Sequence, residues 1–128
     1  MTKKDLTPKG VFRFFQEIND IPRPSKHEEK MIAYLKNFGE SRGLETVVDE
    51  TGNVIIRKNA SKGYEDSPTV IIQSHMDMVC DKVAGKDIDF MTDPIETYID
   101  GEWMRAQGTT LGADDGIGCA MELALLDD

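Results

Sequence analysis

The sequence predicts an α/β domain in which helices flank a mixed β-sheet. The chain of 128 residues has the length of one ordinary domain, and its 39% hydrophobic and 30% charged residues are typical of globular proteins. Apolar residues recur with helical spacing in three segments, and short β-branched runs lie between them. Helical and strand patterns in one short chain indicate a sheet covered by helices.

The first predicted helix spans residues 8–19. Thr7 is a suitable N-terminal cap, and Pro8 suits the first helical position because its missing N–H has no helical partner there. Two prolines at 22 and 24 end the helical pattern. The apolar stripe of this helix consists of Val11, Phe14, Phe15 and Ile18.

A second helix is predicted to begin at Ser25. Glu28, three residues further on, completes the pattern of a capping box, and Gly43 is a suitable C-terminal cap. The residues of this helix that are expected in the core are Met31, Ile32, Leu35 and Phe38.

Strand patterns follow in the middle of the chain. Residues 44–49 and 53–58 flank Glu50-Thr51-Gly52 and predict a hairpin. Residues 59–67 form a polar loop, and the β-branched run 69–74 predicts a central strand that is covered on both faces. This strand is the expected centre of the mixed sheet.

The C-terminal part begins with an irregular acidic segment over residues 80–97. A hairpin is predicted over 98–104, with its turn at Asp100-Gly101. A third helix is predicted over 116–126. Its expected apolar side consists of Ile117, Ala120, Met121, Ala124 and Leu125.

Charge and targeting patterns exclude several classes of partner. The net charge of −9 comes from 15 basic and 24 acidic residues, so a nucleic-acid backbone is repelled. No apolar run approaches the ~20 residues that span a bilayer, and the N-terminal segment lacks the apolar stretch of a signal peptide. Cys80 and Cys119 suit a reducing compartment. We therefore expect a cytoplasmic protein without nucleic-acid or membrane partners.

His75 and Asp77 are the first candidate site residues. They directly follow the predicted central strand, and open α/β sheets bind ligands beyond the carboxyl ends of their strands. Alternate residues of an extended segment point to one side. Imidazole is a good zinc ligand, and a nearby carboxylate can orient the imidazole ring. The alternative is that His75 only caps the strand through a hydrogen bond.

Residues 109–118, Thr-Thr-Leu-Gly-Ala-Asp-Asp-Gly-Ile-Gly, form the second candidate motif. Glycines permit close backbone approach, and a carboxylate can bridge two cations about 3.5–4 Å apart. The alternative is that Asp114 and Asp115 only cap the third helix. A phosphate-binding loop is disfavoured, because two aspartates repel phosphate and no lysine follows them.

Together the two motifs closely resemble the M20 metallopeptidases. Ser-His-Met-Asp-Met-Val at 74–79 and Gly-Thr-Thr-Leu-Gly-Ala-Asp at 108–114 are most similar to the aminoacyl-histidine dipeptidase branch, and Pro-Arg-Pro-Ser at 22–25 also fits. The resemblance implies a zinc-aminopeptidase-like catalytic domain. We expect residues 1–128 to be its N-terminal portion, without the lid or dimerisation domain.

The resemblance also implies a role for each site residue. His75 would be a terminal ligand of one metal ion, Asp114 the carboxylate that bridges two ions, and Asp77 the catalytic acid that orients the site, with Asp115 in a supporting role. The implied cofactor is Zn²⁺, two ions per complete site, with Co²⁺ or Mn²⁺ as alternatives. The implied substrates are Xaa-His dipeptides such as carnosine, and the resemblance allows a homodimer.

One part of the family pattern lies outside the chain. The general base of the family belongs to a Glu-Glu pair downstream of Asp128, and Glu122 does not match its position. A catalytic zinc usually has three protein ligands, and this chain offers two. We therefore expect the 128 residues alone to bind zinc weakly and to hydrolyse no dipeptide. The alternative function is a non-catalytic domain that binds a cation or a partner.

Overall fold

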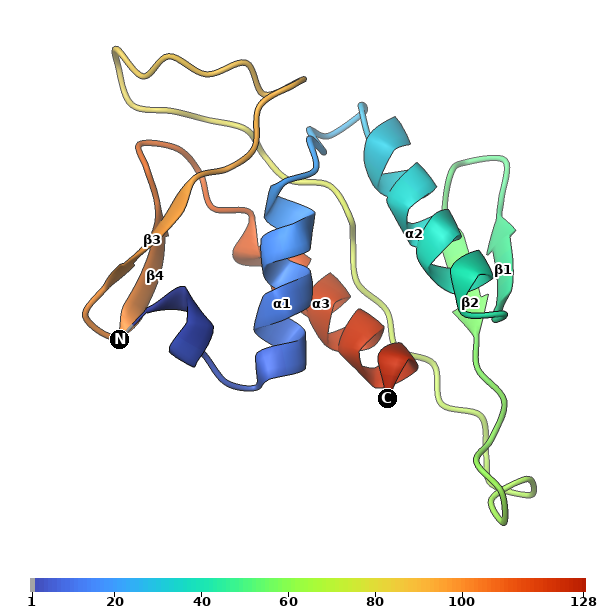
Figure 1. The fold of residues 1–128 in the computed structure, drawn as a ribbon. Helices are drawn as coiled ribbons and strands as arrows, with labels where there is room; N and C mark the ends of the chain where they lie inside the picture. Colours follow the sequence, from blue (N-terminus) through green and yellow to red (C-terminus); the bar gives the residue numbers. More distant parts are fainter. Residues whose placement is uncertain (1) are drawn as a thin grey trace. The chain divides into compact units, whose positions relative to one another are not determined.

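The computed structural model describes residues 2–128, which divide into two units. One unit comprises residues 2–31 and 73–128, and the other comprises Ile32–Ile72. A short 3₁₀ helix, η1 (Lys3–Asp5), precedes the first α-helix. Figure 1 shows the order of the elements along the chain, in which helices and strands both occur as the sequence predicted.

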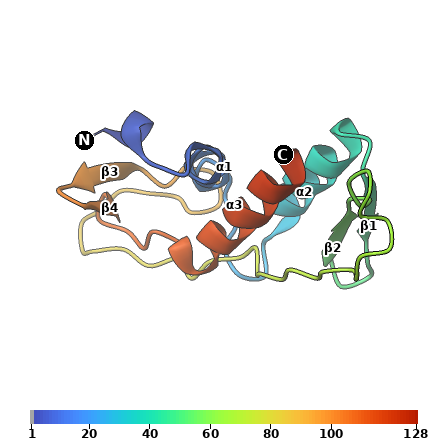
Figure 2. The same cartoon turned by 90° about the horizontal axis from the view of Figure 1, so that it is seen from below.

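The core of the first unit lies between α1 (Lys9–Asn19) and α3 (Ala113–Asp127), which pack against each other (Figure 1, Figure 2). Aromatic and aliphatic side chains come from α1, and small residues of α3 let the two backbones approach closely. The buried residues at this core are Phe14, Phe15, Ile18, Gly116, Cys119, Ala120 and Leu123.

The predicted apolar stripe of α1 is confirmed, but its predicted start is wrong by one residue. Pro8 occupies the cap position instead of Thr7, because its extended ψ of 132° places it outside the helix. Its carbonyl accepts the first helical hydrogen bond, from Phe12 N at 3.2 Å.

A third helix is confirmed, but it begins at Ala113 rather than at residue 116, and its predicted buried side is right only in part. Ala120 is buried as predicted, whereas Met121 and Leu125 are exposed. The helix is apolar on most sides, so spacing alone does not select a face. The small residues Gly116 and Ala120 select the face that contacts α1, because they leave room for its phenylalanines.

The first unit also contains a hairpin of β3 (Thr97–Asp100) and β4 (Trp103–Ala106). The strands are antiparallel, with Thr97 opposite Ala106 and Asp100 opposite Trp103. Gly101 takes a φ of 61° in the turn, a conformation that glycine adopts without strain. The predicted hairpin at Asp100-Gly101 is therefore confirmed.

The second unit contains most of α2 (Glu29–Ser41) and the antiparallel hairpin of β1 (Glu45–Val48) and β2 (Val54–Arg57). The turn is held by Asp49, whose Oδ1 accepts from the backbone N–H groups of Thr51 at 2.9 Å and Asn53 at 2.8 Å. This confirms the predicted hairpin. Of the residues predicted to lie in the core from α2, Met31, Leu35 and Phe38 are buried.

The predicted capping box at Ser25 is wrong, because α2 begins four residues later. Residues 24–27 instead form a turn, closed by a 2.8 Å hydrogen bond from His27 N to the Pro24 carbonyl. Lys26 takes a left-handed φ of 73° within this turn. The Ser25 hydroxyl donates to Asp77 and Met78 rather than to a helix terminus.

The predicted central strand over 69–74 is also wrong. Residues 69–74 have no ladder partner within residues 2–128, and Ile71 is 85% exposed. A β-branched run forms a strand only where a neighbouring strand supplies hydrogen-bond partners. Within residues 2–128 the sheets are the two antiparallel hairpins, and residues 69–74 belong to neither of them. The predicted mixed sheet around a central strand is therefore not formed by the described residues.

Candidate metal centre

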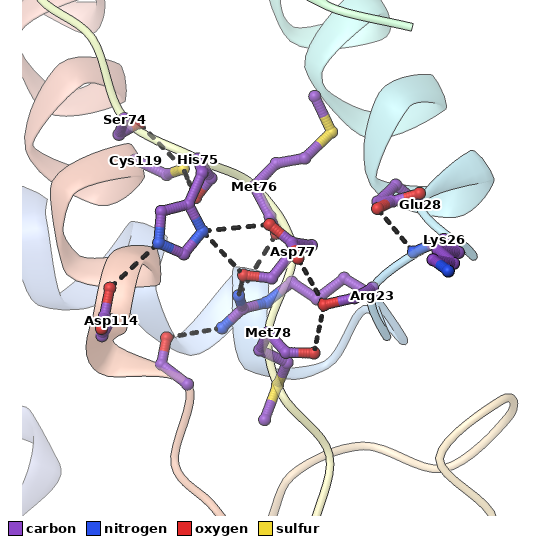
Figure 3. Close-up of polar contacts among 12 residues, drawn as sticks. Arg23, Lys26, Glu28, Ser74, His75, Met76, Asp77, Met78, Asp114 and Cys119 are labelled. Atoms are coloured by element: carbon purple, nitrogen blue, oxygen red, sulfur yellow. Dashed lines mark hydrogen bonds and ion pairs between the residues drawn. The ribbon is translucent and has the colours of Figure 1, made fainter. Parts of the chain in front are cut away.

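The candidate centre lies where residues 74–78 meet the first turn of α3 (Figure 3). His75 Nε2 is 3.0 Å from Asp114 Oδ1, although 39 residues separate the two in sequence. The side chain of His75 is 55% exposed and that of Asp114 is 96% exposed. The structure thus brings the two predicted metal ligands together at a surface that solvent and ions can reach.

Asp77 holds the other side of the His75 ring. Its Oδ1 is 3.0 Å from His75 Nδ1, and its backbone carbonyl is 3.2 Å from the same nitrogen. Its second carboxylate oxygen accepts a hydrogen bond from the Ser25 hydroxyl. Asp77 is therefore fixed by Ser25 and in turn orients His75.

The two carboxylates favour a charged His75 in the metal-free chain. The hydrogen bond to Asp114 raises the pKa of His75, and the contact with Asp77 adds to the effect. The Ser25 hydroxyl lowers the pKa of Asp77, and His75 lowers it further. Only the imidazolium form donates from both ring nitrogens, so it satisfies both carboxylates at once.

The zinc affinity of the chain is expected to fall on acidification from a pH above the usual imidazole pKa of about 6.5. Zinc must displace the proton on His75 Nε2, and this proton is held more tightly because the pKa is raised. The raised pKa of His75 also stabilises the metal-free fold at any pH below the pKa that His75 has in the unfolded chain. This stabilisation is lost as the pH rises through the pKa of His75 in the folded chain.

The pH prediction is checked by calorimetric zinc titrations between about pH 8 and about pH 5, alongside the NMR titration of the His75 ring. His27, an exposed histidine, provides the internal NMR reference. A zinc affinity that stays constant over this range would show that His75 does not compete with protons for the metal.

Asp114 and Asp115 interrupt the start of α3. Both have non-helical dihedral angles, with ψ of 103° and 35°, and a cis peptide bond joins them. A Cβ added at Gly118 would lie 2.5 Å from Asp115 Oδ1, so the Asp115 side chain lies against the helix. Of these two aspartates, Asp114 is the one hydrogen-bonded to His75.

Glu122 lies close to the centre without taking part in it. Its Oε2 accepts from the Ser74 hydroxyl at 2.8 Å, and burial raises the pKa of its carboxyl. Cys119 contacts the same hydroxyl at 3.1 Å. These contacts anchor residue 74 to α3.

The donors at this centre suit zinc in kind but not in number. Imidazole nitrogen and carboxylate oxygen are both common zinc ligands. Two ligands of one tetrahedral zinc ion lie roughly 3.3 Å apart, close to the observed 3.0 Å between His75 and Asp114. Within residues 2–128, however, no group of three or more His, Cys, Asp or Glu side chains is placed to hold one ion.

Two residues that support the centre are not predicted by the sequence patterns as part of it. The pattern around Ser25 predicts a helix cap, and Arg23 occurs only within the Pro-Arg-Pro-Ser motif. Arg23 is buried, and it donates to the backbone on both sides of the centre. The sequence signal that could have pointed to it is its place in the Pro-Arg-Pro-Ser motif at 22–25.

Comparison with known proteins supports the predicted resemblance. The chain is 46% identical over 123 residues to the cytosol non-specific dipeptidase of Escherichia coli, covering 96% of this chain and 25% of that protein. It superposes on the crystal structure of aminoacylhistidine dipeptidase from Vibrio alginolyticus with a TM-score of 0.95 and 47% identity, covering 98% of this chain and 26% of that one. The chain resembles the N-terminal part of an M20 dipeptidase.

One further solved structure has a similar fold. A tripeptidase from Staphylococcus aureus matches with a TM-score of 0.74 at 22% identity, which shows the likeness of fold alone. No protein-family model matches the chain. The chain spans about a quarter of the length of the two dipeptidases that it matches. In residues 2–128, no helix has the length and apolar character needed to cross a membrane.

Proposed function

We propose that this chain contributes part of the dinuclear metal centre of a cytoplasmic dipeptidase that hydrolyses Xaa-His dipeptides. The 3.0 Å approach of His75 Nε2 to Asp114 Oδ1 carries this proposal, because it joins the two motifs of the M20 resemblance at one exposed point. The likeness to two dipeptidases supports the reaction class.

Each of the three side chains has a distinct task in this proposal. Asp77 accepts the Nδ1 proton of His75, so Nε2 would be the ring nitrogen that holds the metal, and the carboxylate makes the ring more basic. Asp114 would be the carboxylate ligand shared by the metal ions, and its side chain is 96% exposed and therefore accessible to them.

Bound zinc would polarise the scissile carbonyl of the dipeptide and lower the pKa of a water molecule. In this proposal His75 and Asp114 would hold the metal and Asp77 would orient His75, and none of residues 2–128 is assigned as the general base. Glu122 is already engaged by Ser74. In this proposal the base and the remaining ligands belong to other parts of a longer protein.

A second candidate function is a non-catalytic cation-binding domain. The absence of a third ligand among the described residues favours it for these 128 residues taken alone. Zinc titration of the chain with and without the downstream coding sequence separates the two functions. Strong binding that needs the downstream segment supports the dipeptidase, whereas equal binding supports the simpler domain.

The Asp77→Asn variant tests the proposal directly. Replacing the carboxylate by an amide is expected to reduce zinc affinity and Xaa-His hydrolysis by the complete gene product about 10–100-fold, because His75 loses the negative charge of its orienting partner. The measurement is zinc titration together with release of free histidine.

The matched control for this test is Asp66→Asn, at an exposed position in the 59–67 loop, which is expected to leave both values unchanged. If the zinc-loaded complete gene product hydrolyses no Xaa-His dipeptide, the dipeptidase proposal is wrong. If the 128 residues alone hydrolyse one, the division of tasks proposed here is wrong.

A further inference from the structure

Arg23 is the largest fully buried side chain of the described residues, with 1% of its surface exposed. A buried guanidinium is costly unless its N–H groups find acceptors. Within residues 2–128 its acceptors are all backbone carbonyls, so no carboxylate forms an ion pair with it. Burial lowers the pKa of Arg23, yet a guanidinium keeps its proton in proteins.

The acceptors of Arg23 lie on both halves of the metal centre (Figure 3). Nη1 donates to the carbonyls of Met76 at 3.3 Å and Asp77 at 3.4 Å. Nη2 donates to the carbonyl of Gly112 at 2.8 Å. One planar group therefore joins the backbone beside His75 to the backbone two residues before Asp114.

The backbone of Arg23 strengthens the first of these connections. Met78 N donates to the Arg23 carbonyl at 3.0 Å, and Ser25 N donates to the Met78 carbonyl at 3.2 Å. These bonds pair residues 23–25 with the segment that carries Asp77. The main chain of Arg23 thereby holds it against the segment that carries His75, and its guanidinium group reaches the segment before Asp114.

Two glycines make room for this fork. A Cβ at Gly112 would lie 2.6 Å from Nη2, and one at Gly116 would lie 2.7 Å from the same atom. Real Cβ atoms do not approach other atoms so closely, so any larger residue would displace the guanidinium. Gly112 also takes a φ of 74°, which independently favours glycine.

We propose that Arg23 is a positioning residue that sets the separation of His75 and Asp114 and thereby the metal affinity of the centre. The metal in this inference rests on the proposed function, whereas the positioning by Arg23 rests on the contacts described above. A lysine keeps the charge but lacks the planar fork, so it cannot bind the three carbonyls in the same way.

Zinc and cobalt titrations of Arg23→Lys and Arg23→Met test the proposal. Both variants are compared with wild type at temperatures where circular dichroism shows each to be folded. We expect zinc affinity to fall about tenfold or more in Arg23→Met, with partial recovery in Arg23→Lys, and the visible spectrum of bound Co²⁺ to change. The exposed Arg57, on β2 of the other unit, gives the control Arg57→Met, which should change neither value.

Folded Arg23 variants with wild-type zinc affinity and an unchanged Co²⁺ spectrum would overturn the proposal, leaving Arg23 a purely structural residue. If Arg23→Met does not fold, Gly116→Ala displaces Nη2 without removing the charge, and the same loss of affinity is expected.

A wild-type chain that binds neither metal would count against the metal site and not against Arg23. The positioning role is then decided by the nuclear Overhauser contact between the His75 ring and the Asp114 methylene. This contact should be present in wild type and lost in Arg23→Met, and its survival in the variant would refute the role of Arg23.

Discussion

Replacing Phe15 by alanine is expected to lower the free energy of unfolding by about 3–5 kcal/mol. Phe15 is 2% exposed and lies between α1 and α3, where a Cβ at Gly116 would come within 3.3 Å of its ring. Glycine leaves no side chain that could fill the resulting cavity. The loss is large against the 5–15 kcal/mol of a typical domain.

Urea denaturation with linear extrapolation measures this change. Ile18→Val, in the same core, removes one methylene and should cost about 0.5–1.5 kcal/mol. Tyr64→Ala removes an exposed aromatic ring and should change the free energy of unfolding by less than about 0.5 kcal/mol. A loss below about 1 kcal/mol in Phe15→Ala would mean that α1 and α3 are not tightly packed.

Elements defined by nearby residues were predicted well. The stripe of α1 depends on the spacing of a few aromatic and aliphatic residues, and Phe14, Phe15 and Ile18 are indeed buried. Both hairpins depend on turn residues such as Gly101 and Asp49, whose conformations and hydrogen bonds are local. Local chemistry of this kind is fully present in the sequence.

Elements that depend on distant partners were predicted less well. Residues 69–74 have the composition of a buried strand but lack ladder partners within the described chain. The buried face of α3 depends on which side α1 packs against, and Met121 and Leu125 illustrate the error. Spacing along one segment carries no information about the segment that covers it.

The candidate centre likewise contains residues that local patterns identify and residues that depend on distant partners. His75, Asp77 and Asp114 could be named because their residue types and motifs carry zinc chemistry. Ser25 and Arg23 support them through contacts across more than 50 residues of sequence, which no local pattern encodes. Ser25 also matched a helix cap, and this local interpretation concealed its bond to Asp77.

Replacing His75 by alanine is expected to lower the zinc affinity of the chain by at least about 100-fold. Changes to residues that only orient a ligand typically cost 10–100-fold, and removing one of two direct ligands costs more. Isothermal titration calorimetry with zinc measures the change. The matched control is His27→Ala, at an exposed histidine that precedes α2, which should leave the affinity unchanged.

The competing explanation for any zinc binding is a thiolate ligand. Cys80 is half-buried and Cys119 is buried, and burial raises the pKa of both thiols, which disfavours the thiolate that zinc requires. The Cys119 thiol also donates to the His75 carbonyl at 3.3 Å and is thereby engaged. His75→Ala should therefore abolish most binding, and Cys80→Ser should have little effect. If instead Cys80→Ser abolished binding and His75→Ala had little effect, zinc would bind at the thiol and not at the centre formed by His75 and Asp114.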